Sequence, residues 1–361
     1  MSTKVFITGS TGYIGGCIME AMVKNPALEI TALLRTITEE FTTRYPKVKI
    51  VKGDFDNFPV IEAAASNAEV IVHAGDMDHP GCVNAILSGL GMRTKRQEKS
   101  FLLHLTGTGC LSDERTNLWD GKLNPWTWND IEHIQKIYDL PEEALHHKID
   151  RQIMDASNEF CKTACICPSD VYGQASGVAN RGTFMVKKRA QLTLKQVPLY
   201  VSTAMIRQET FFLGAGENTK DVVHVEDIAT LFILLLEHAI RGGGEAQWGK
   251  EGFYICLNET PVQIKQLAEA ITKLGVAQSW LLKDAKPVSW TAEQVGSILP
   301  HAPRIARYLW GSNTRAIAAR AKALGWKPIQ KPFWESLEED VSIAVATTKE
   351  KLAAKALKSK A

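Results

Sequence analysis

Short apolar runs alternate with helical patterns along the first half of the chain. Val5–Ile7 and Val70–Val72 are uninterrupted apolar runs, which is typical of strands that are buried on both faces. The segments between such runs repeat their apolar residues every three or four positions, as amphipathic helices do. This alternation predicts an α/β fold with a doubly wound parallel sheet. The expected strands lie at residues 5–7, 29–34, 48–51, 70–75, 101–105, 162–167 and 252–257.

The first strand runs directly into a glycine-rich turn, and a helical pattern follows from Ile14 onward. Gly9 permits the tight turn, Gly12 lets the backbone approach a pyrophosphate with no Cβ in the way, and Gly15 lets the helix pack closely on the strand. Unpaired N–H groups and the helix dipole favour phosphate at such a helix start. This context predicts a dinucleotide site, with a turn that merely joins strand to helix as the alternative. The residues assigned to the site are Gly9, Thr11, Gly12, Tyr13, Ile14 and Gly15.

Arg35 follows the second strand, at the tip that faces the adenine ribose in a dinucleotide fold. An acidic residue there would bind the ribose 2′-hydroxyl of NAD, whereas an arginine accommodates the 2′-phosphate of NADP. The nearby acids, Glu39 and Glu40, come several residues later. We therefore expect NADP(H) to be favoured over NAD(H), with a solvated loop charge as the alternative role of Arg35.

Small or hydroxylated residues follow two later strands, at the edge where the ligands of such sheets bind. Ala74 and Gly75 end the fourth strand and would let a cofactor lie against it. Thr106 and Thr108 follow the fifth strand, which makes them candidates for contacting a reacting group. A threonine after a strand is also a common cap or turn residue.

The rest of the chain combines helical patterns with one irregular segment. The irregular segment 111–138 carries Trp119, Trp126 and Trp128, which either wall a pocket for a flat or apolar substrate or anchor the segment to the body. The basic residues 92–100 are expected to form a solvated connection, with phosphate binding as the lesser alternative. Helices are expected at residues 140–159, 228–239, 262–274 and 314–324.

Composition narrows the class of protein without deciding it. A formal net charge of +2 over 361 residues gives no reason to invoke nucleic acid, and no apolar run reaches the length of a membrane span. The first residues already form a core strand, so we expect no signal peptide and a cytoplasmic location. The seven cysteines suit a reducing compartment. Cys161, Cys165 and Cys167 lack the spacing of a zinc site, so no metal site is expected.

Taken together, these motifs resemble those of the extended short-chain dehydrogenase/reductases, a group of NAD-dependent epimerases, dehydratases and dihydroflavonol-reductase-like enzymes. Thr8–Gly15 is similar to the group's nucleotide fingerprint, Asp54–Phe55 to its adenine-side motif, and Pro168–Gly173 to the segment after its sixth strand. Residues 214–227 and 313–328 resemble its later signatures. The resemblance covers most of the chain and implies a Rossmann-type domain with a smaller, mostly C-terminal α/β substrate domain. It adds four residues to the cofactor site, namely Asp54, Phe55, Pro168 and Ser169.

The chain departs from this group at the catalytic residues. The group's chemistry usually rests on a Ser or Thr and a Tyr-x-x-x-Lys pair, and no such pair occurs in the expected helix. Alignment on that helix puts His147 in the position of Tyr and Arg151 in that of Lys, and leaves Thr106 or Thr108 as the hydroxyl. His147 could act as a general acid, because an unperturbed histidine has a pKa of about 6.5. Arg151 could bind ribose hydroxyls, but its lasting positive charge would lower the pKa of His147.

The expected function is that of an NADP(H)-dependent oxidoreductase that reduces a carbonyl, or oxidises an alcohol, of a small organic molecule. Two alternatives stay open: a non-redox epimerase or lyase that retains its cofactor, and an inactive NADP(H)-binding sensor in which His147 is an ordinary surface histidine. The expected partner is a small-molecule substrate, for which Arg181 and Arg207 are either anion contacts or plain surface charges. A homodimer is an option, and neither nucleic acid nor a membrane is expected as a partner.

The motifs also predict how the chain is divided. The dinucleotide-binding domain should comprise residues 1–170, with residues 220–256 returning to it. The substrate domain should comprise residues 171–219 and 257–345. Residues 346–361 are rich in Ala and Lys, so we expect a frayed or flexible tail there.

Overall fold

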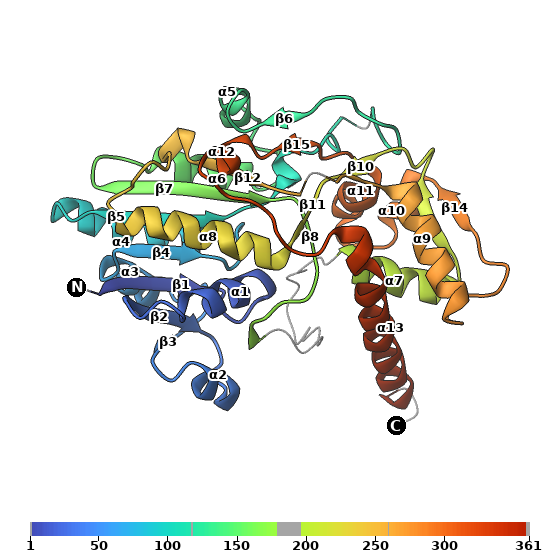
Figure 1. The fold of residues 1–361 in the computed structure, drawn as a ribbon, viewed down its shortest axis with the longest axis horizontal. Coiled ribbons are helices and arrows are strands. Elements are labelled where there is room, and N and C mark those ends of the chain that lie inside the picture. The colour runs from blue at the N-terminus through green and yellow to red at the C-terminus, as the bar shows by residue number, and fades with distance from the viewer. Residues whose placement is uncertain (1, 117, 179–195, 259, 359–361) are drawn as a thin grey trace.

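A seven-stranded parallel sheet forms the centre of the N-terminal part of the protein (Figure 1). The computed structural model describes residues 2–358 apart from Asn117, residues 179–195 and Glu259, so Arg181 lies outside the described residues. The spatial order of the strands is β3-β2-β1-β4-β5-β7-β12, and every neighbouring pair is parallel. The predicted α/β class and parallel sheet are confirmed. The strands are β1 (Thr3–Thr8), β2 (Leu28–Leu34), β3 (Lys49–Lys52), β4 (Val70–His73), β5 (Ser100–Leu105), β7 (Cys161–Pro168) and β12 (Phe253–Cys256).

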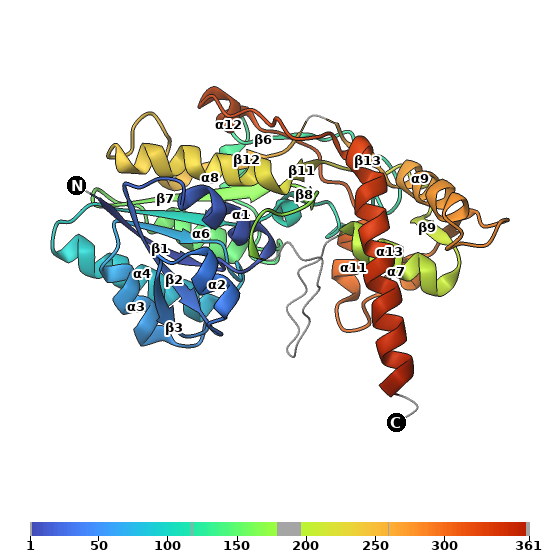
Figure 2. The ribbon, with the colours of Figure 1, turned by 60° about the horizontal axis from the view of Figure 1, so that its bottom comes forward.

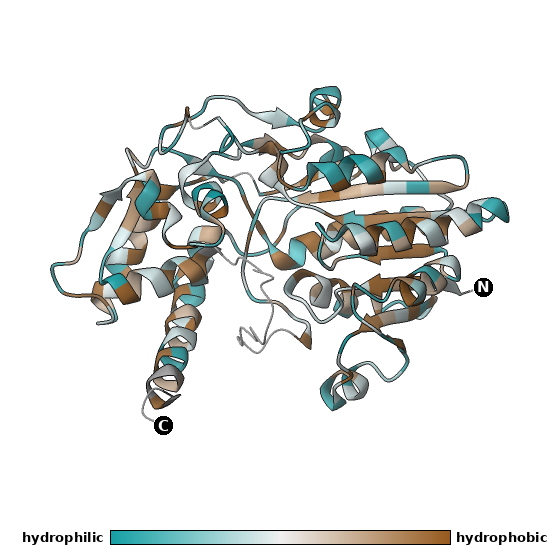
Figure 3. Cartoon of the chain, turned by 180° about the vertical axis from the view of Figure 1, so that it is seen from behind, coloured by the Kyte–Doolittle hydropathy of each residue, from teal (hydrophilic) through white to brown (hydrophobic). Residues whose placement is uncertain are grey.

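Helices cover both faces of this sheet, so central strands such as β4 and β5 are buried on both sides, as their apolar runs predict (Figure 2). Helices α1 and α8 pack against each other on one face, and α3 and α4 pack against each other on the opposite face. Helix α6 packs on β7, and α12 packs on β12. Coloured by hydropathy, the strands are mostly brown and the helices around them carry teal (Figure 3). The helices of this part are α1 (Tyr13–Met22), α2 (Glu39–Arg44), α3 (Phe58–Ser66), α4 (Pro80–Lys95), α6 (His147–Asp155), α8 (Val225–Ile240) and α12 (Ala319–Ala323).

The C-terminal part has a hydrophobic core of its own, built around stacked aromatic rings. The ring of Phe211 stacks on those of Tyr200 and Trp290, at centroid distances of 4.6 and 4.2 Å. The Tyr200 hydroxyl donates to the Phe211 carbonyl, which satisfies the polar end of a fully buried ring. The elements around this core are α7 (Gln196–Arg207), β9 (Thr210–Leu213), α9 (Ile264–Ala277), β14 (Pro287–Trp290), α10 (Ala292–Gly296), α11 (Pro303–Gly311) and α13 (Phe333–Lys358).

Short paired strands carry the chain between the two cores. Strand β8 (Asp170–Tyr172) pairs with β11 (Val222–His224), and both leave the carboxyl edge of the large sheet. The remaining short elements are β6 (Trp128–Asn129), which pairs with β15 (Ala316–Ile317), β10 (Thr219–Lys220), which pairs with β13 (Val262–Gln263), α5 (Ile134–Tyr138), and the 3₁₀ turns η1 (Thr108–Leu111) and η3 (Gly249–Glu251). Polar groups of η1, β8, β10 and α11 meet in this connecting region.

Three expected helices differ from those observed. The helix expected from residue 140 begins at His147, because residues 141–145 form turns and His146 takes the left-handed conformation, with φ of +68°. The segment expected to be helical at 314–324 contains β15 before the short α12, and the one expected at 262–274 begins with β13. Residues 346–358, expected to be a frayed or flexible tail, continue helix α13, and Thr348 is buried there.

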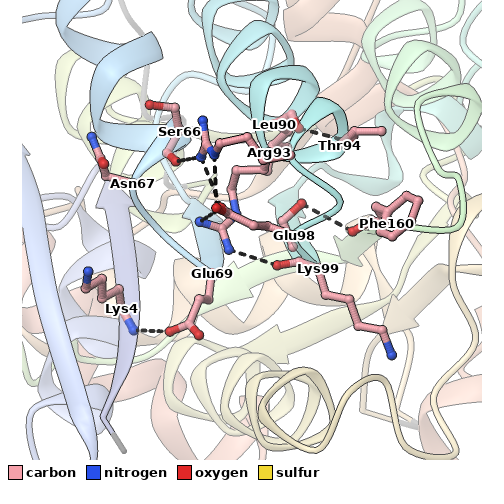
Figure 4. A network of polar contacts seen from close by, with 12 residues as sticks. Lys4, Ser66, Asn67, Glu69, Leu90, Arg93, Thr94, Glu98, Lys99 and Phe160 are labelled. Atoms are coloured by element: carbon pink, nitrogen blue, oxygen red, sulfur yellow. Dashed lines mark hydrogen bonds and ion pairs between the residues drawn. The ribbon is translucent and has the colours of Figure 1, made fainter.

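The basic residues 92–100 run from the end of α4 to the start of β5, so they lie at the amino edge of the sheet, opposite the glycine turn after β1. Figure 4 shows the polar contacts of Arg93 and Glu98 there. Arg93 donates to the Lys99 carbonyl at 3.0 Å and pairs with Glu98 at 3.1 Å. Arg96 also pairs with Glu98 and donates to the Ser66 carbonyl at 2.7 Å, which fastens the end of α4 to the end of α3. These contacts give the basic residues a structural role and place them far from the expected phosphate site.

Helices of the described ranges are too short or too polar to cross a bilayer.

Candidate active site

Contacts of the fold itself require two of the three glycines in the turn after β1. Gly9 has a φ of +76°, and a Cβ there would lie 2.2 Å from the carbonyl oxygen of Ala74. A Cβ on Gly15 would lie 2.2 Å from the carbonyl oxygen of Gly9. Real Cβ atoms do not approach backbone so closely, so these two positions would be glycine whether or not the protein binds a nucleotide.

Gly12 has no such requirement. It is the N-cap of α1, with φ of −83° and ψ of 176°, a conformation that any residue adopts. A Cβ there would meet the Gly9 carbonyl oxygen at 3.1 Å and otherwise face open space. Thr11 and Gly12 are both exposed, and no side chain caps the helix. An exposed, uncapped helix start without a Cβ fits the approach of a pyrophosphate, whereas a turn that merely joins strand to helix would accept a side chain there.

The other residues assigned to the cofactor lie along the carboxyl edge of the sheet. Arg35 and Asp54 are exposed just after β2 and β3, respectively. The ring of Phe55 lies against Gly75, since a Cβ on Gly75 would be 2.5 Å from that ring. Ala74 is buried beside Gly9.

Tyr13 and Ile14, which the glycine motif assigns to the cofactor site, pack into the protein in different ways. Tyr13 is buried, and its hydroxyl donates to the Gly173 carbonyl at 2.6 Å, so its side chain fastens α1 to the loop after β8. Ile14 is half-buried against the first core. On the far side of the sheet centre, Pro168 ends β7, and the Ser169 N–H donates to the Cys256 carbonyl at 3.0 Å. The Ser169 hydroxyl is buried and has no partner among the described residues.

A buried carboxyl and a threonine hydroxyl meet at the end of β5. Thr106 Oγ1 donates to Asp150 Oδ2 at 2.9 Å, and both side chains are fully buried. Asp150 Oδ1 has no hydrogen-bond partner among the described residues and lies 3.8 Å from His104 Nε2. Burial raises the pKa of Asp150 to about 7, although His146 and Thr106 act to lower it. Asp150 is therefore a carboxyl that changes its protonation near neutral pH, beside a strand end where ligands of this fold bind.

His146, rather than His147, faces the loop that carries the two threonines. Its Nδ1 lies 2.9 Å from both carboxylate oxygens of Asp78. Its Nε2 would lie 3.0 Å from a Cβ on Gly109, so this edge of the ring borders the loop Gly107–Gly109. Burial acts to lower the pKa of His146, but the hydrogen bond and charge of Asp78, aided by Asp150, raise it overall.

Among the described residues, no hydrogen bond or ion pair joins His147 or Arg151 to this loop. His147 is 1% exposed, and burial and the nearby Arg151 lower its pKa. The Nε2 atom of His147 has no hydrogen-bond partner among the described residues. Arg151 is exposed, and its guanidinium lies over the ring of Tyr138, 4.7 Å from the centroid. The catalytic roles assigned to both residues stay predictions, and the contacts favour the pair His146 and Asp150, which has the same spacing of four.

The pair favoured by the contacts, His146 and Asp150, lies one residue before the pair predicted from the sequence, His147 and Arg151. The alignment assumes a helix that runs continuously from residue 140. His146 instead takes the left-handed conformation, so the helix begins only at His147 and the residues before it follow a different path. Each step along a helix turns a side chain by about 100°, so neighbouring residues such as Asp150 and Arg151 face different surroundings. The sequence does contain a signal for the pair, because an acid four residues after His146 on an otherwise buried face is unusual.

The tryptophans of the irregular segment anchor it to the body. Trp128 Nε1 donates to the Leu111 carbonyl at 2.9 Å, and the ring of Trp126 packs edge-on against that of Trp128 at 5.7 Å. These contacts favour the anchoring role over a pocket wall.

Thr108, the second threonine after β5, begins η1 and is 2% exposed. Its Oγ1 has no hydrogen-bond partner among the described residues.

The cysteines show no sign of binding a metal in the part of the chain that the structure describes. All seven are buried thiols. Within the described ranges, no group of three or more His, Cys, Asp or Glu side chains is arranged to hold a metal ion.

No protein-family model matches the chain. Oxidase ucsJ from an Acremonium species is 28% identical to it over 352 residues, which cover 94% of this chain and 96% of that protein. An uncharacterized protein from Saccharomyces cerevisiae is 21% identical over 356 residues, which cover 94% of this chain and 99% of that protein.

Solved structures define the fold more sharply. A dTDP-glucose 4,6-dehydratase from Bacillus anthracis, solved in complex with NAD, superposes with a TM-score of 0.59 at 14% identity, covering 95% of this chain and 96% of that one. A UDP-glucose 4-epimerase from Thermotoga maritima, solved with UDP-glucose, gives a TM-score of 0.60 at 16% identity, covering 97% and 99%. The protein therefore has the fold of the extended short-chain dehydrogenases/reductases, as its motifs predict.

Proposed function

We propose that the protein is an NADP(H)-dependent oxidoreductase that reduces a carbonyl, or oxidises an alcohol, of a small organic molecule. One observation carries the proposal: the open helix start at Gly12 and the polar group Thr106, His146 and Asp150 lie at the same carboxyl edge of the sheet. A dinucleotide that spans this edge would reach both. The name of the oxidase relative and the NAD complex of the dehydratase support the same reading.

The cofactor would be held by the chain's own backbone and by a few side chains. The start of α1 at Gly12 would bind the pyrophosphate, and the exposed Arg35 would pair with the 2′-phosphate that distinguishes NADP from NAD. The NADP(H) preference rests on Arg35 alone. When bound, NADP(H) supplies or accepts the hydride.

His146 is the residue best placed to supply the proton. Asp78 holds Nδ1, which leaves Nε2 toward the loop Gly107–Gly109, and the raised pKa of His146 keeps the ring protonated nearer to neutral pH. In a reduction, the proton moves from Nε2 to the carbonyl oxygen as that oxygen gains charge, and His146, which is part-exposed, recovers a proton from water. When Asp150 is protonated, its carboxyl can donate to Thr106 instead of accepting from it, and the Thr106 hydroxyl would then be free to donate to the substrate oxygen.

The experiment that tests this function compares two neighbouring histidines. We would follow NADPH absorbance over a panel of small aldehydes and ketones with wild type, His146→Ala and His147→Ala. Loss of a general acid typically costs about 10²-fold or more in turnover, so His146→Ala should lose that much while folded His147→Ala keeps most of its rate. The opposite pattern would restore His147 to the role that the sequence suggests.

The same assay separates the alternatives. Product formed with no net change in NADPH would point to an epimerase or lyase that retains its cofactor. Tight NADPH binding with no product from any member of the panel would point to a binding protein without catalysis. Either result would refute the oxidoreductase proposal.

A further inference from the structure

A second group of polar side chains lies where the two hydrophobic cores meet. It consists of Thr108 from η1, Asp170 from β8, Lys220 from β10 and Tyr308 from α11, which we call the interface cluster. The Tyr308 hydroxyl donates to Asp170 Oδ1 at 3.3 Å, and the Lys220 ammonium lies 3.9 Å from the centroid of the Tyr308 ring. Four segments that are far apart in the sequence thus converge on one point beside the loop after β5.

Two oxygen atoms of the interface cluster have no partner within the described residues. Thr108 Oγ1 and Asp170 Oδ2 are both shielded from solvent and make no hydrogen bond of good geometry there, although Thr108 lies close enough to the Tyr308 hydroxyl to act on its pKa. The Ser169 hydroxyl, next to Asp170 in the chain, is in the same condition. Leaving a buried polar atom unpaired is unfavourable, so the two oxygens of the interface cluster need a reason. A ligand group that enters this place and bonds to these oxygens would supply one.

The charges around the interface cluster indicate which kind of group fits. Lys220 is fully buried and already donates to Ser312 Oγ at 3.1 Å, while four carboxylates act on it. They are those of Asp170, Asp113, Glu114 and Asp221. These carboxylates offset part of the effect of burial, which lowers the pKa of Lys220, and the unpaired oxygen of Asp170 can only accept a hydrogen bond when ionised. The unpaired oxygen of Asp170 therefore suits a hydroxyl or an amine, which donates a hydrogen bond, rather than a carboxylate or a phosphate, which accepts one.

The interface cluster is also close to the proposed reaction site. Thr106 and Thr108 are two residues apart, which limits their Cα atoms to roughly 7 Å. A substrate whose carbonyl lies at Thr106 and His146 could therefore place a nearby donor at Thr108 without a long spacer.

We propose that Thr108, Asp170 and Tyr308 form a substrate subsite that binds a hydroxyl or amine a few bonds from the reacting carbonyl. This inference rests on the oxidoreductase function proposed above. Lys220 acts as a positioning residue, because its ammonium holds the Tyr308 ring and offsets the charge of Asp170. Reduction by this protein should then favour hydroxy- or aminoketones over plain ketones of the same shape.

Matched ketone pairs test the subsite directly. In hydroxyacetone and 2-butanone, and in 4-hydroxy-2-butanone and 2-pentanone, one hydroxyl replaces one methyl group. For wild type, kcat/KM with NADPH should favour the hydroxy member of at least one pair by about tenfold or more, as expected for a hydrogen bond to a charged group. Asp170→Asn should reduce this ratio to near one. Asp120→Asn is the control, since it removes a carboxylate that pairs with Arg307 on the same helix as Tyr308 but outside the interface cluster.

Each outcome decides between the proposals. A wild type that reduces no ketone refutes the oxidoreductase function and this inference with it. A wild type that reduces both members equally, or an Asp170→Asn protein that keeps the full ratio, refutes the subsite alone. Should Asp170→Asn fail to fold, Thr108→Val provides the same test. A folded variant that reduces neither ketone contradicts the subsite, because the residue would then serve the chemistry itself.

Discussion

Replacing Asp150 with asparagine should make the protein less sensitive to rising pH. The Asp150 side chain is fully buried, receives one hydrogen bond from Thr106 at 2.9 Å, and has one oxygen without a partner among the described residues. Burial raises its pKa from 3.8 to about 7. Asparagine keeps an acceptor for Thr106 and directs its amide toward His104, whose Nε2 lies 3.8 Å from the carboxyl oxygen that the amide replaces.

The sign and size of the effect follow from this shift in pKa. A carboxyl whose pKa is raised by folding costs no stability below its unfolded pKa, and the cost grows as pH rises until it is complete above the folded pKa. A rise from 3.8 to about 7 corresponds to a cost on the order of 4 kcal/mol at pH 8, of which roughly half is added between pH 5.5 and pH 8. His146 acts in the same direction, because the stability that its raised pKa contributes is also lost as pH rises.

Urea unfolding at pH 5.5 and pH 8 measures this difference. Relative to wild type, Asp150→Asn should gain about 2 kcal/mol in free energy of unfolding on going from the lower to the higher pH. The control is Asp139→Asn, because Asp139 is exposed and its carboxylate accepts a hydrogen bond from the nearby Gln135 side chain at 2.6 Å. If Asp150→Asn were destabilised equally at both pH values, Asp150 would be an ordinary structural hydrogen-bond acceptor and its assignment to the site would lose its physical basis.

Three further predictions concern the cofactor site and its supports. Arg35→Ala should weaken NADPH binding about 10- to 100-fold in calorimetric titration and leave NADH binding unchanged, because only NADPH carries the phosphate for the exposed guanidinium; equal affinity of both proteins for NADPH would remove Arg35 from the site. Gly9→Ala should lower the melting temperature markedly, since a Cβ 2.2 Å from the Ala74 carbonyl oxygen must displace backbone, and an unchanged value would show that the turn can relax. Trp128→Phe should cost about 1 kcal/mol of stability through the lost bond to the Leu111 carbonyl and leave NADPH binding intact; a loss of binding at full stability would assign Trp128 to a ligand pocket instead.

Local patterns were sufficient to predict the sheet. Buried parallel strands require apolar side chains on both faces, and the runs at Val5–Ile7 and Phe101–Leu105 satisfy that requirement without help from distant contacts. The glycine turn was equally readable from its spacing, because Gly15 packs on the nearby Gly9, although Gly9 itself lies against the distant Ala74. The register of helix α6 could not be read from the sequence, since the left-handed His146 is held by Asp78, which lies 68 positions earlier in the chain.

Polar groups that meet only in the folded protein were harder still to foresee. Nothing near Lys220 in the sequence distinguishes a fully buried ammonium from a surface lysine. Its burial follows from α11, which brings Tyr308 over it, and from Ser312, which accepts its hydrogen bond. The place of Thr106 after a strand predicts its position at the site, but the Tyr-x-x-x-Lys spacing selects Arg151 and not its neighbour Asp150, the partner of Thr106.

Gly12→Ala tests the dinucleotide cradle most directly, because Gly12 is the glycine that the turn itself does not need. Its φ of −83° suits alanine, and the added Cβ would meet only the Gly9 carbonyl oxygen, at 3.1 Å. We predict a melting temperature close to that of wild type and a calorimetric affinity for NADPH that falls at least about tenfold, because the methyl group occupies the approach of the pyrophosphate. Unchanged NADPH affinity in the folded variant, or no NADPH binding by the wild type, would contradict a phosphate site at this helix start.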